Sequence, residues 1–454
     1  MSEITEELEG IDLGDERLNK RSRVIIDGLM KNQRSGIPGN CKGMAETQGA
    51  YRFFNNKRVT PAKLLVGHAH TTLQRVKEHA TVLAVEDTSF LSFGGKRSRA
   101  DLGPHTSGME NGLNLHLCLA LTPSGWNLGL LRAQLYIKDR EQGLKGDHKQ
   151  RPIEEKESYR WLQGIEHCGA LRPELENTEL VYVADRESDI YELYRAAERQ
   201  NTKWLIRAAY NRKTADGRLL FTEAESAQEV GQTEWELKAR PGRTARRVRQ
   251  SIRVARVSLR PPRRLKGVAG EHPNVEVCLV YAKEINPPEG EEPISWMLLT
   301  NLPVEDLQKA SEKIDWYRCR WQVEVYYKTL KSICGVEKLQ LQSREGLENA
   351  VGMCMLVAWR IQYLTTIARE KSTADQECDR YLEETEWKAI HVLHQRSKPP
   401  SRAPSVREVV HMLGALGGHL GRKHDGPPGA RSIAEGLNKL YQFIDNQDLI
   451  QKLK

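Results

Sequence analysis

The sequence of 454 residues lacks any long uninterrupted run of apolar residues. No stretch approaches the roughly 18 to 20 uncharged apolar residues that a membrane-spanning helix needs. The N-terminal segment MSEITEELEG is acidic and has no apolar signal core. We therefore expect no membrane partner and a cytoplasmic location. With 39% hydrophobic residues, 9 Trp and 14 Tyr, the chain is also too apolar and aromatic to be disordered.

The sequence also lacks the common cysteine patterns of metal sites. Its eight cysteines include no CxxC pair, and no histidine follows them at zinc-finger spacing. Reduced structural thiols are the simplest interpretation. His68 and His70, in GHAH, have no further ligands nearby, so a solvated helix face is favoured over a metal site.

Acidic residues are absent from one long basic segment. From Lys238 to Lys266 the chain has twelve Lys or Arg and no Asp or Glu, and the whole chain has a formal net charge of +8. Such a run is a candidate phosphate-binding surface, because each Lys or Arg on a phosphate releases condensed counterions. A solvated basic loop explains the charge equally well.

The length predicts two to four domains. Residues 1–70 show helical periodicity and predict a small helical module. From about 80 to 210, short apolar runs predict strands, with amphipathic helices between the later ones, and hence a mixed α/β sheet. Residues 211–300 alternate β-branched residues with arginine and predict an inserted β-rich subdomain, and residues 370–454 are predicted to be helical.

Two aspartates stand at the ends of predicted buried strands. Asp87 follows the apolar run Val82–Val85, and Asp185 follows Leu180–Ala184. Oxygen ligands of this kind, held on rigid strands, can bind Mg²⁺ against a phosphodiester. Taken singly, each aspartate is more simply explained as a turn or N-cap residue.

A third acid lies in DWYRCRWQVEVYYKTLKSICG. Tyr317, Arg320, Glu324 and Lys331 fall within an arc of about 60° if the segment is one regular α-helix. Glu324 on that face can complete a metal site, while the other three side chains contact phosphates. An ordinary charged helix surface is the alternative.

These residues carry a resemblance to a known family. The spacing Y-x2-R-x3-E-x6-K resembles the signature of bacterial DDE transposases of the insertion-sequence-four group, and within it the transposon-five branch. The segments VEDTSFLSF, ADRESDIYEL, AYRFFNN and LGDERL are similar to segments of that family and occur in the same order. The resemblance runs from about residue 13 to about residue 331, and only a general helical likeness continues beyond.

The resemblance implies a fold and a domain order. It implies an α/β catalytic core of the ribonuclease-H-like (retroviral-integrase-like) type at residues 71–369, with a mixed sheet flanked by helices. A β-rich insertion interrupts the core at about 211–300. A helical domain that binds DNA ends occupies residues 1–70, and a helical dimerisation domain occupies residues 370–454.

The resemblance also implies an activity. A cut-and-paste transposase of this family binds transposon end repeats, nicks them, forms and opens a DNA hairpin, and joins the 3′ ends to target DNA. The expected catalytic and metal-binding residues are Asp87, Asp185 and Glu324, with Mg²⁺ as cofactor and Mn²⁺ as a substitute. The expected partners are double-stranded DNA and a second copy of the chain, at the nucleoid in a bacterial cytoplasm.

Further DNA-binding residues follow from the same resemblance. Trp296, in ISWMLLT, matches a tryptophan that receives a base flipped from the DNA end, although a Trp before Met-Leu-Leu is also explained as strand core. Arg207 matches an arginine near the active site and is expected on a DNA phosphate. Trp321 is expected to stack at the DNA end, and Tyr317, Arg320 and Lys331 are expected on phosphates.

Other activities remain open from the sequence. A relative that keeps the fold and binds DNA without cutting it, acting as an inhibitor or regulator, is the main alternative. The three acids and the Y-R-E-K residues argue against it. A plain nuclease is disfavoured by the N-terminal module and the long helical tail. The DNA end sequence that the chain recognises is left open.

Overall fold

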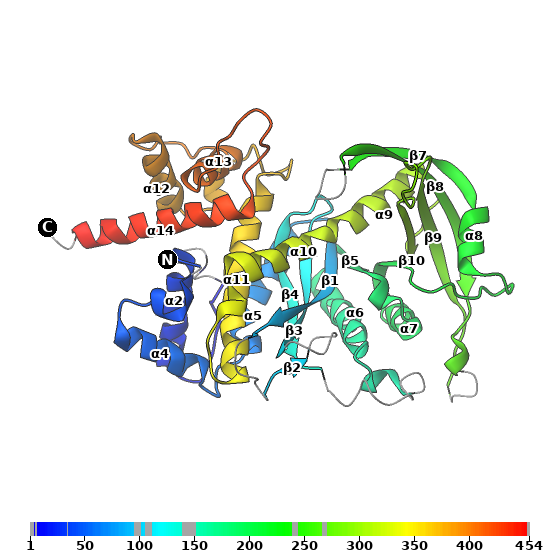
Figure 1. The fold of residues 1–454 in the computed structure, drawn as a ribbon, viewed down its shortest axis with the longest axis horizontal. Coiled ribbons are helices and arrows are strands. Elements are labelled where there is room, and N and C mark those ends of the chain that lie inside the picture. The colour runs from blue at the N-terminus through cyan, green and yellow to red at the C-terminus, as the bar shows by residue number, and fades with distance from the viewer. Residues whose placement is uncertain are drawn as a thin grey trace. The chain divides into compact units, whose positions relative to one another are not determined.

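Two units make up the computed structural model (Figure 1), which describes residues 4, 7–33, 35–94, 101–104, 111–138, 151–237, 244–265 and 270–451. The first unit contains Met1–Glu78, Thr88–Arg140 and Gln322–Lys454. The second contains His79–Asp87 and Glu141–Trp321. Each is described below by itself.

The secondary structure follows the predicted order of helices, then strands, then helices. The α-helices are α2 (Glu16–Lys31), α3 (Gly36–Gly39), α4 (Met44–Phe54), α5 (Pro61–Lys77), α6 (Tyr159–Leu171), α7 (Tyr191–Arg199), α8 (Leu220–Ser226), α9 (Leu307–Cys319), α10 (Trp321–Lys328), α11 (Arg344–Ile367), α12 (Glu384–Gln395), α13 (Val406–Leu416) and α14 (Ala430–Gln451). The strands are β1 (Thr81–Ser92), β2 (Gly103–Pro104), β3 (Asn111–Leu121), β4 (Asn127–Tyr136), β5 (Glu179–Ala184), β6 (Lys203–Arg207), β7 (Gln228–Leu237), β8 (Arg246–Leu259), β9 (Val275–Glu284) and β10 (Ser295–Thr300).

The second unit is built on a mixed sheet with the strand order β1-β5-β6-β10-β9-β8-β7 (Figure 1). Strands β1, β5 and β6 are parallel, and the strands from β6 onward are antiparallel. The central strands are continuous apolar runs, as expected for strands that are covered on both faces. The predicted mixed sheet is therefore confirmed.

The strands predicted for residues 211–300 are present, but they do not form a sheet of their own. Strand β10 pairs with β6, with Leu298 opposite Arg207, so β10, β9, β8 and β7 extend the core sheet. Alternation of β-branched residues predicts a strand but not its partner. The bounds of the inserted β-rich subdomain stay a prediction.

Helices α6 and α9 cover opposite faces of this sheet. Successive side chains of a strand point to opposite faces. On β1, Glu86 is fully buried against α6, where a Cβ atom added to Gly164 would lie 2.0 Å from Glu86 Oε2. The next residue, Asp87, contacts Arg320 at the end of α9. Glu86 also accepts a hydrogen bond from the buried Tyr182 hydroxyl at 2.5 Å.

A side chain at position 164 would therefore displace the Glu86 carboxylate. We expect Gly164→Ala to destabilise the protein by about 1 to 3 kcal/mol, because the added methyl group forces the Glu86 carboxylate out of its place. Chemical denaturation measures the change in the free energy of unfolding. Gly429→Ala is the control, since a Cβ atom there meets nothing within 4 Å. Equal stability of the two variants would contradict the close packing of α6 on β1.

The first unit is centred on helix α11. This helix is long and apolar enough to cross a membrane by length and composition, but its apolar window is entirely buried within the protein, as in the core helix of a soluble protein. Its buried Arg360 is ion-paired. Arg360 contacts Glu386 of α12 at 3.2 Å, and Glu386 accepts a hydrogen bond of 2.6 Å from Tyr441 of α14. These contacts join three C-terminal helices.

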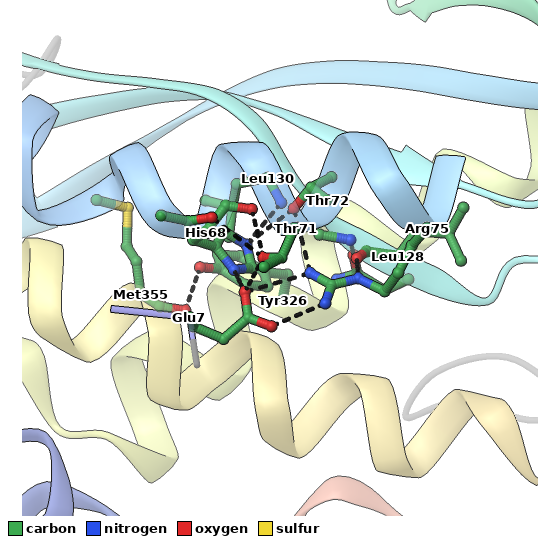
Figure 2. A network of polar contacts seen from close by, with 12 residues as sticks. Glu7, His68, Thr71, Thr72, Arg75, Leu128, Leu130, Tyr326 and Met355 are labelled. Carbon is green, nitrogen blue, oxygen red and sulfur yellow. Dashed lines mark hydrogen bonds and ion pairs between the residues drawn. The ribbon is translucent and has the colours of Figure 1, made fainter. Parts of the chain in front are cut away.

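A buried polar network holds the N-terminal segment on α5 and β4 (Figure 2). Glu7 contacts His68 and accepts a hydrogen bond from Arg75 at 2.7 Å. The backbone N–H of Leu130 donates to His68 Nε2 at 2.9 Å, so Nδ1 carries the proton and donates to Glu7. Burial lowers the pKa of His68, which is neutral here. The prediction of a solvated GHAH face is wrong for His68, because the N-terminal segment covers it.

The same network determines the charge of Glu7. Burial by itself would raise the pKa of this carboxyl, but the contacts with His68 and Arg75 outweigh burial and lower the pKa to about 2. Glu7 is thus ionised at neutral pH and is held by Arg75, whose guanidinium also packs on the Trp359 ring at 4.5 Å. Since α5 and β4 meet at these residues, the network joins the N-terminal helices to the body of the first unit.

The cysteines agree with their expected role. All eight are free thiols, and Cys118, Cys168, Cys278, Cys334, Cys354 and Cys378 are buried. Burial raises the pKa of the Cys354 thiol to about 12. These cysteines are therefore unreactive structural residues.

Candidate active site

The two predicted aspartates lie at neighbouring strand ends in the second unit. Val85 of β1 is opposite Val183 of the parallel strand β5, so Asp87 and Asp185, each two residues further on, occupy matching positions. Adjacent strands lie about 4.8 Å apart. Both side chains are partly exposed, although the strands that lead to them are buried. The sheet therefore brings two carboxylates together.

Asp185 also caps a short helix. It is the N-cap of the 3-10 helix Arg186–Ser188, and its Oδ1 accepts a hydrogen bond from the backbone N–H of Glu187 at 2.8 Å. The N-cap interpretation made from the sequence is correct for Asp185. It does not conflict with metal binding, because a carboxylate has two oxygens and about four lone-pair positions.

Asp87 faces a guanidinium group. Arg320 Nη1 lies 2.5 Å from Asp87 Oδ2, and both side chains are about one-sixth exposed. Arg320 directly follows α9, whose C-terminus points its last carbonyl groups toward this arginine. The carboxylate is therefore matched by a positive charge, which shows that this position accommodates a cationic group.

Arg207 and Tyr317 form a second pair beside these acids. Arg207 ends β6, and its Nη2 donates to the Ser295 carbonyl at 3.1 Å. The Tyr317 hydroxyl lies near it. Burial raises the pKa of Tyr317 and lowers the pKa of Arg207, so it disfavours the charged form of both side chains. Asp185 and Arg320 lie close enough to Tyr317 to influence its ionisation.

Trp296 lies in an aromatic cluster next to Tyr317. Its ring is nearly parallel to that of Trp235, with centroids 6.0 Å apart and an interplanar angle of 17°. Its edge meets Tyr317 at 6.2 Å, and the Arg318 guanidinium lies 5.2 Å from the Trp235 ring. Trp296 is partly exposed, unlike Leu298 on the same strand. Trp296 is thus a half-buried strand residue packed against two rings, and a role at the DNA end stays a prediction.

Glu324 and Lys331 belong to the first unit, and the assumption of one regular α-helix fails there. Helix α9 ends at Cys319, α10 covers Trp321–Lys328, and Thr329–Ile333 is a π-helix that contains Lys331. A π-helix uses i→i+5 hydrogen bonds, so the spacing of 100° per residue does not extend to Lys331. The predicted 60° arc is thus wrong as geometry.

Buried side chains of the first unit fix the helix that carries Glu324. Tyr326 donates to the Met355 carbonyl of α11 at 2.8 Å. Gln362, also on α11, donates to the Gln322 carbonyl at 2.8 Å. Glu324 itself is partly exposed between these anchors. Trp321, at the start of the helix, is 47% exposed, as a residue that stacks on DNA requires.

The basic run is a strand rather than a loop, and most of its described arginines are ion-paired. Residues 238–243 and Lys266 lie outside the described residues. The pairs are Arg246 with Glu284 and Glu291, Arg247 and Arg249 with Glu234, Arg253 with Glu229, Arg256 with Glu305, and Arg264 with Glu192. The sequence does not reveal these pairs, because the acids come from segments outside the basic run. A phosphate-binding role for the run stays a prediction.

Sequence reasoning missed two residues of this region. Trp235 lies on a strand of alternating exposure, and its pairing with Trp296 depends on the register of β7, β8, β9 and β10. Asp189 lies within ADRESDIYEL, four residues after Asp185, and is buried with several donors. The only signal for Asp189 was its place in a motif already quoted, since burial of an acid cannot be read from spacing.

The donor set fits a divalent cation in its chemistry. Among the residues that the structure describes, no group of three His, Cys, Asp or Glu side chains is close enough to hold a metal ion. Asp87 and Asp185 nevertheless supply oxygen ligands from neighbouring rigid strand ends, which Mg²⁺ prefers. The contact between the Arg320 guanidinium and Asp87 shows that a positive charge fits beside this carboxylate. The residues present therefore fit a hard cation.

A mixed α/β sheet that presents paired strand-end carboxylates beside arginines is compatible with metal-dependent phosphoryl transfer. Family comparisons make this specific. A transposase DNA-binding model matches residues 1–59, a transposase DDE domain matches residues 163–360, and a transposase Tn5 dimerisation domain matches residues 356–452. These three matches are the domains of a Tn5-like DDE transposase, and the DDE domain implies a ribonuclease-H-like core.

One solved structure also resembles the chain. It is described as the cryo-EM structure of a piggyBac transposase synaptic complex with hairpin DNA. The identity is 10% and the TM-score is 0.35, and the match covers 78% of this chain and 66% of that one. The chain thus spans slightly less than two thirds of that relative.

Proposed function

We propose that this chain is a cut-and-paste transposase that binds transposon end repeats, cleaves them by metal-dependent hydrolysis through a hairpin intermediate, and joins the 3′ ends to target DNA. The observation that best supports this proposal is the register of β1 and β5, which sets Asp87 beside Asp185. Glu324, which lies within the matched DDE domain, is the proposed third carboxylate.

The proposed roles of the surrounding residues follow from their chemistry. Asp87, Asp185 and Glu324 would hold Mg²⁺, or Mn²⁺ in its place, which lowers the charge of the reacting phosphate and favours attack by water or a 3′-hydroxyl. Arg207 and Arg320 remain charged and bind DNA phosphates. Because the protein itself forms no covalent bond to the DNA in this scheme, positioning of the DNA strand supplies much of the rate enhancement.

The proposed partners are two DNA segments and a second copy of the chain. DNA binding and dimer formation are supported by the DNA-binding and dimerisation domains. A dimer allows two transposon ends to be held together before they are cut. Within the cell, such an enzyme acts in the cytoplasm at the nucleoid. Lys331 and Trp321 are proposed to contact the DNA backbone and the end base pairs.

A cleavage assay tests the proposal. The substrate is a labelled DNA duplex that carries the inverted repeats flanking the gene, and cleavage is measured with and without Mg²⁺. We expect a nick, then a hairpin, and then a blunt end, all dependent on Mg²⁺. Binding of the repeats with no cleavage under any divalent metal would overturn the proposal in favour of a silent DNA-binding relative.

Trp296 provides a test of the hairpin step. We expect Trp296→Ala to slow hairpin formation by about tenfold or more while the first nick proceeds, because a flipped base loses about 1 to 3 kcal/mol of stacking. Denaturing gels of a time course separate the nicked strand from the hairpin. Trp296→Phe retains a stacking surface and should lose less. An equal loss of nicking and hairpin formation would contradict base capture by Trp296.

A further inference from the structure

Asp189 is a buried carboxylate at the centre of a hydrogen-bonded cluster. Only 1% of the residue is exposed. Its Oδ2 accepts hydrogen bonds from the consecutive backbone N–H groups of Ala209 at 2.7 Å and Tyr210 at 3.0 Å. Its Oδ1 accepts from the Tyr194 hydroxyl at 2.7 Å and from Arg212 Nη2 at 2.6 Å and Nε at 3.0 Å. Both carboxylate oxygens are therefore fully engaged.

Contacts within this cluster shift the pKa values of two of its side chains, Arg212 and Tyr194. Burial opposes the charge of Arg212, but Asp189 and Tyr194 outweigh it and raise the pKa of this guanidinium. Burial and the neighbouring Asp189 raise the pKa of the Tyr194 hydroxyl well above its usual value. Arg212 Nη2 also donates to the Asp189 carbonyl at 2.5 Å. A buried ion pair of this kind is costly unless every donor and acceptor is satisfied, as it is here.

The cluster joins two segments that carry site residues. Asp189 belongs to the turn after β5, which begins with Asp185. Apart from the Tyr194 hydroxyl on α7, its donors belong to residues 209–212, which follow Arg207 at the end of β6. Just before those donors, the Ala208 N–H donates to Met297 on β10 at 2.8 Å. The turn and the segment are thus held together only a few residues from both site residues.

We propose that Asp189 is a positioning residue of the DNA-cleaving site, acting through Arg207. By holding residues 208–212 against the turn that carries Asp185, it fixes the direction in which Arg207 leaves β6 and keeps its guanidinium beside Tyr317. This inference rests on the proposed transposase function. Asp189 itself contacts no DNA; it sets the geometry in which Arg207 meets a phosphate.

Two variants test the proposal. Asp189→Asn keeps the size of the side chain but replaces one acceptor oxygen with a donor, and Arg212→Gln removes the guanidinium while leaving the carboxylate and the two backbone N–H groups in place. We expect each to slow single-turnover cleavage of end DNA by between about tenfold and a hundredfold, as a misplacement of about 1 Å does. The Kd for end DNA should change less than about twofold, since one phosphate contact among many is affected.

A double-mutant cycle separates positioning from general stability. In an Arg207→Ala background we expect Asp189→Asn to slow cleavage further by less than about threefold, because the residue through which it acts is already gone. Asp216→Asn, in an exposed turn of the same unit, is the matched control and should cleave normally. An equal loss in both backgrounds, full activity of both test variants, or unfolding of both would overturn the proposal. Absence of cleavage by the parent protein would instead overturn the proposed function.

Discussion

Asp87→Asn, Asp185→Asn and Glu324→Gln are each expected to reduce Mg²⁺-dependent cleavage of end DNA by about a thousandfold or more, because each removes one charged metal ligand. The amide variants are chosen for the structure around them. Asparagine caps a helix about as well as aspartate, so Asp185→Asn keeps the 3-10 helix Arg186–Ser188. A loss of cleavage in this variant therefore reports on the carboxylate and not on the cap.

The measurement is a single-turnover rate with saturating enzyme, paired with a gel-shift assay of end binding. We expect each variant to bind the end DNA nearly as well as the parent, since phosphate contacts dominate affinity. Asp216→Asn serves as the control carboxylate and should cleave at the parental rate. Parental activity in any one of the three test variants would remove that residue from the proposed triad.

Glu7→Gln is expected to destabilise the protein by about 3 kcal/mol, because it leaves Arg75 without the carboxylate that compensates its charge. The same carboxylate makes stability depend on pH. The pKa of Glu7 is lowered to about 2 in the folded protein, against 4.5 for a free glutamate. A lowered pKa means that its contribution is fully present above about pH 4.5 and is lost as the pH falls toward 2.

Urea denaturation at a series of pH values between about 3 and 7 measures the free energy of unfolding. The expected loss on acidification is on the order of a few kcal/mol. The parent should lose stability on acidification more steeply than Glu7→Gln, so the two curves should converge at low pH. Glu16→Gln is the control, because Glu16 is an exposed helix residue whose 3.9 Å pair with Lys20 contributes little. Parallel curves for the parent and Glu7→Gln would contradict the assignment of Glu7 as the titrating group.

Much of the fold could be predicted from the sequence because its signals are local. Apolar runs of four to eight residues predicted β1, β3, β4, β5 and β6, and helical periodicity predicted α2 and α6. The pairing of β1 with β5, which sets the two strand-end acids side by side, is given only by the structure. What a local signal cannot supply is the partner of a strand, which is why β10 on the edge of β6 was not anticipated.

The candidate site shows the same division. Asp87, Asp185, Tyr317 and Arg207 were selected from motifs, and the structure brings these four together in one unit. The ion pair of Arg320 with Asp87 was not predicted, because spacing along a helix does not show which strand the helix crosses. The π-helix at Lys331 was also not predicted, because no residue type indicates an i→i+5 hydrogen bond.

The pairing of β10 with β6 has a consequence for which insertions and deletions the sequence can tolerate during evolution. Trp296 and Arg207 are separated by almost ninety residues of sequence, yet backbone hydrogen bonds between two neighbouring strands fix one relative to the other. Lengthening or shortening the turns that join β7, β8 and β9 leaves that ladder untouched. The connections between the outer strands can therefore change in length while Trp296 and Arg207, the two side chains proposed to meet DNA, keep their spacing.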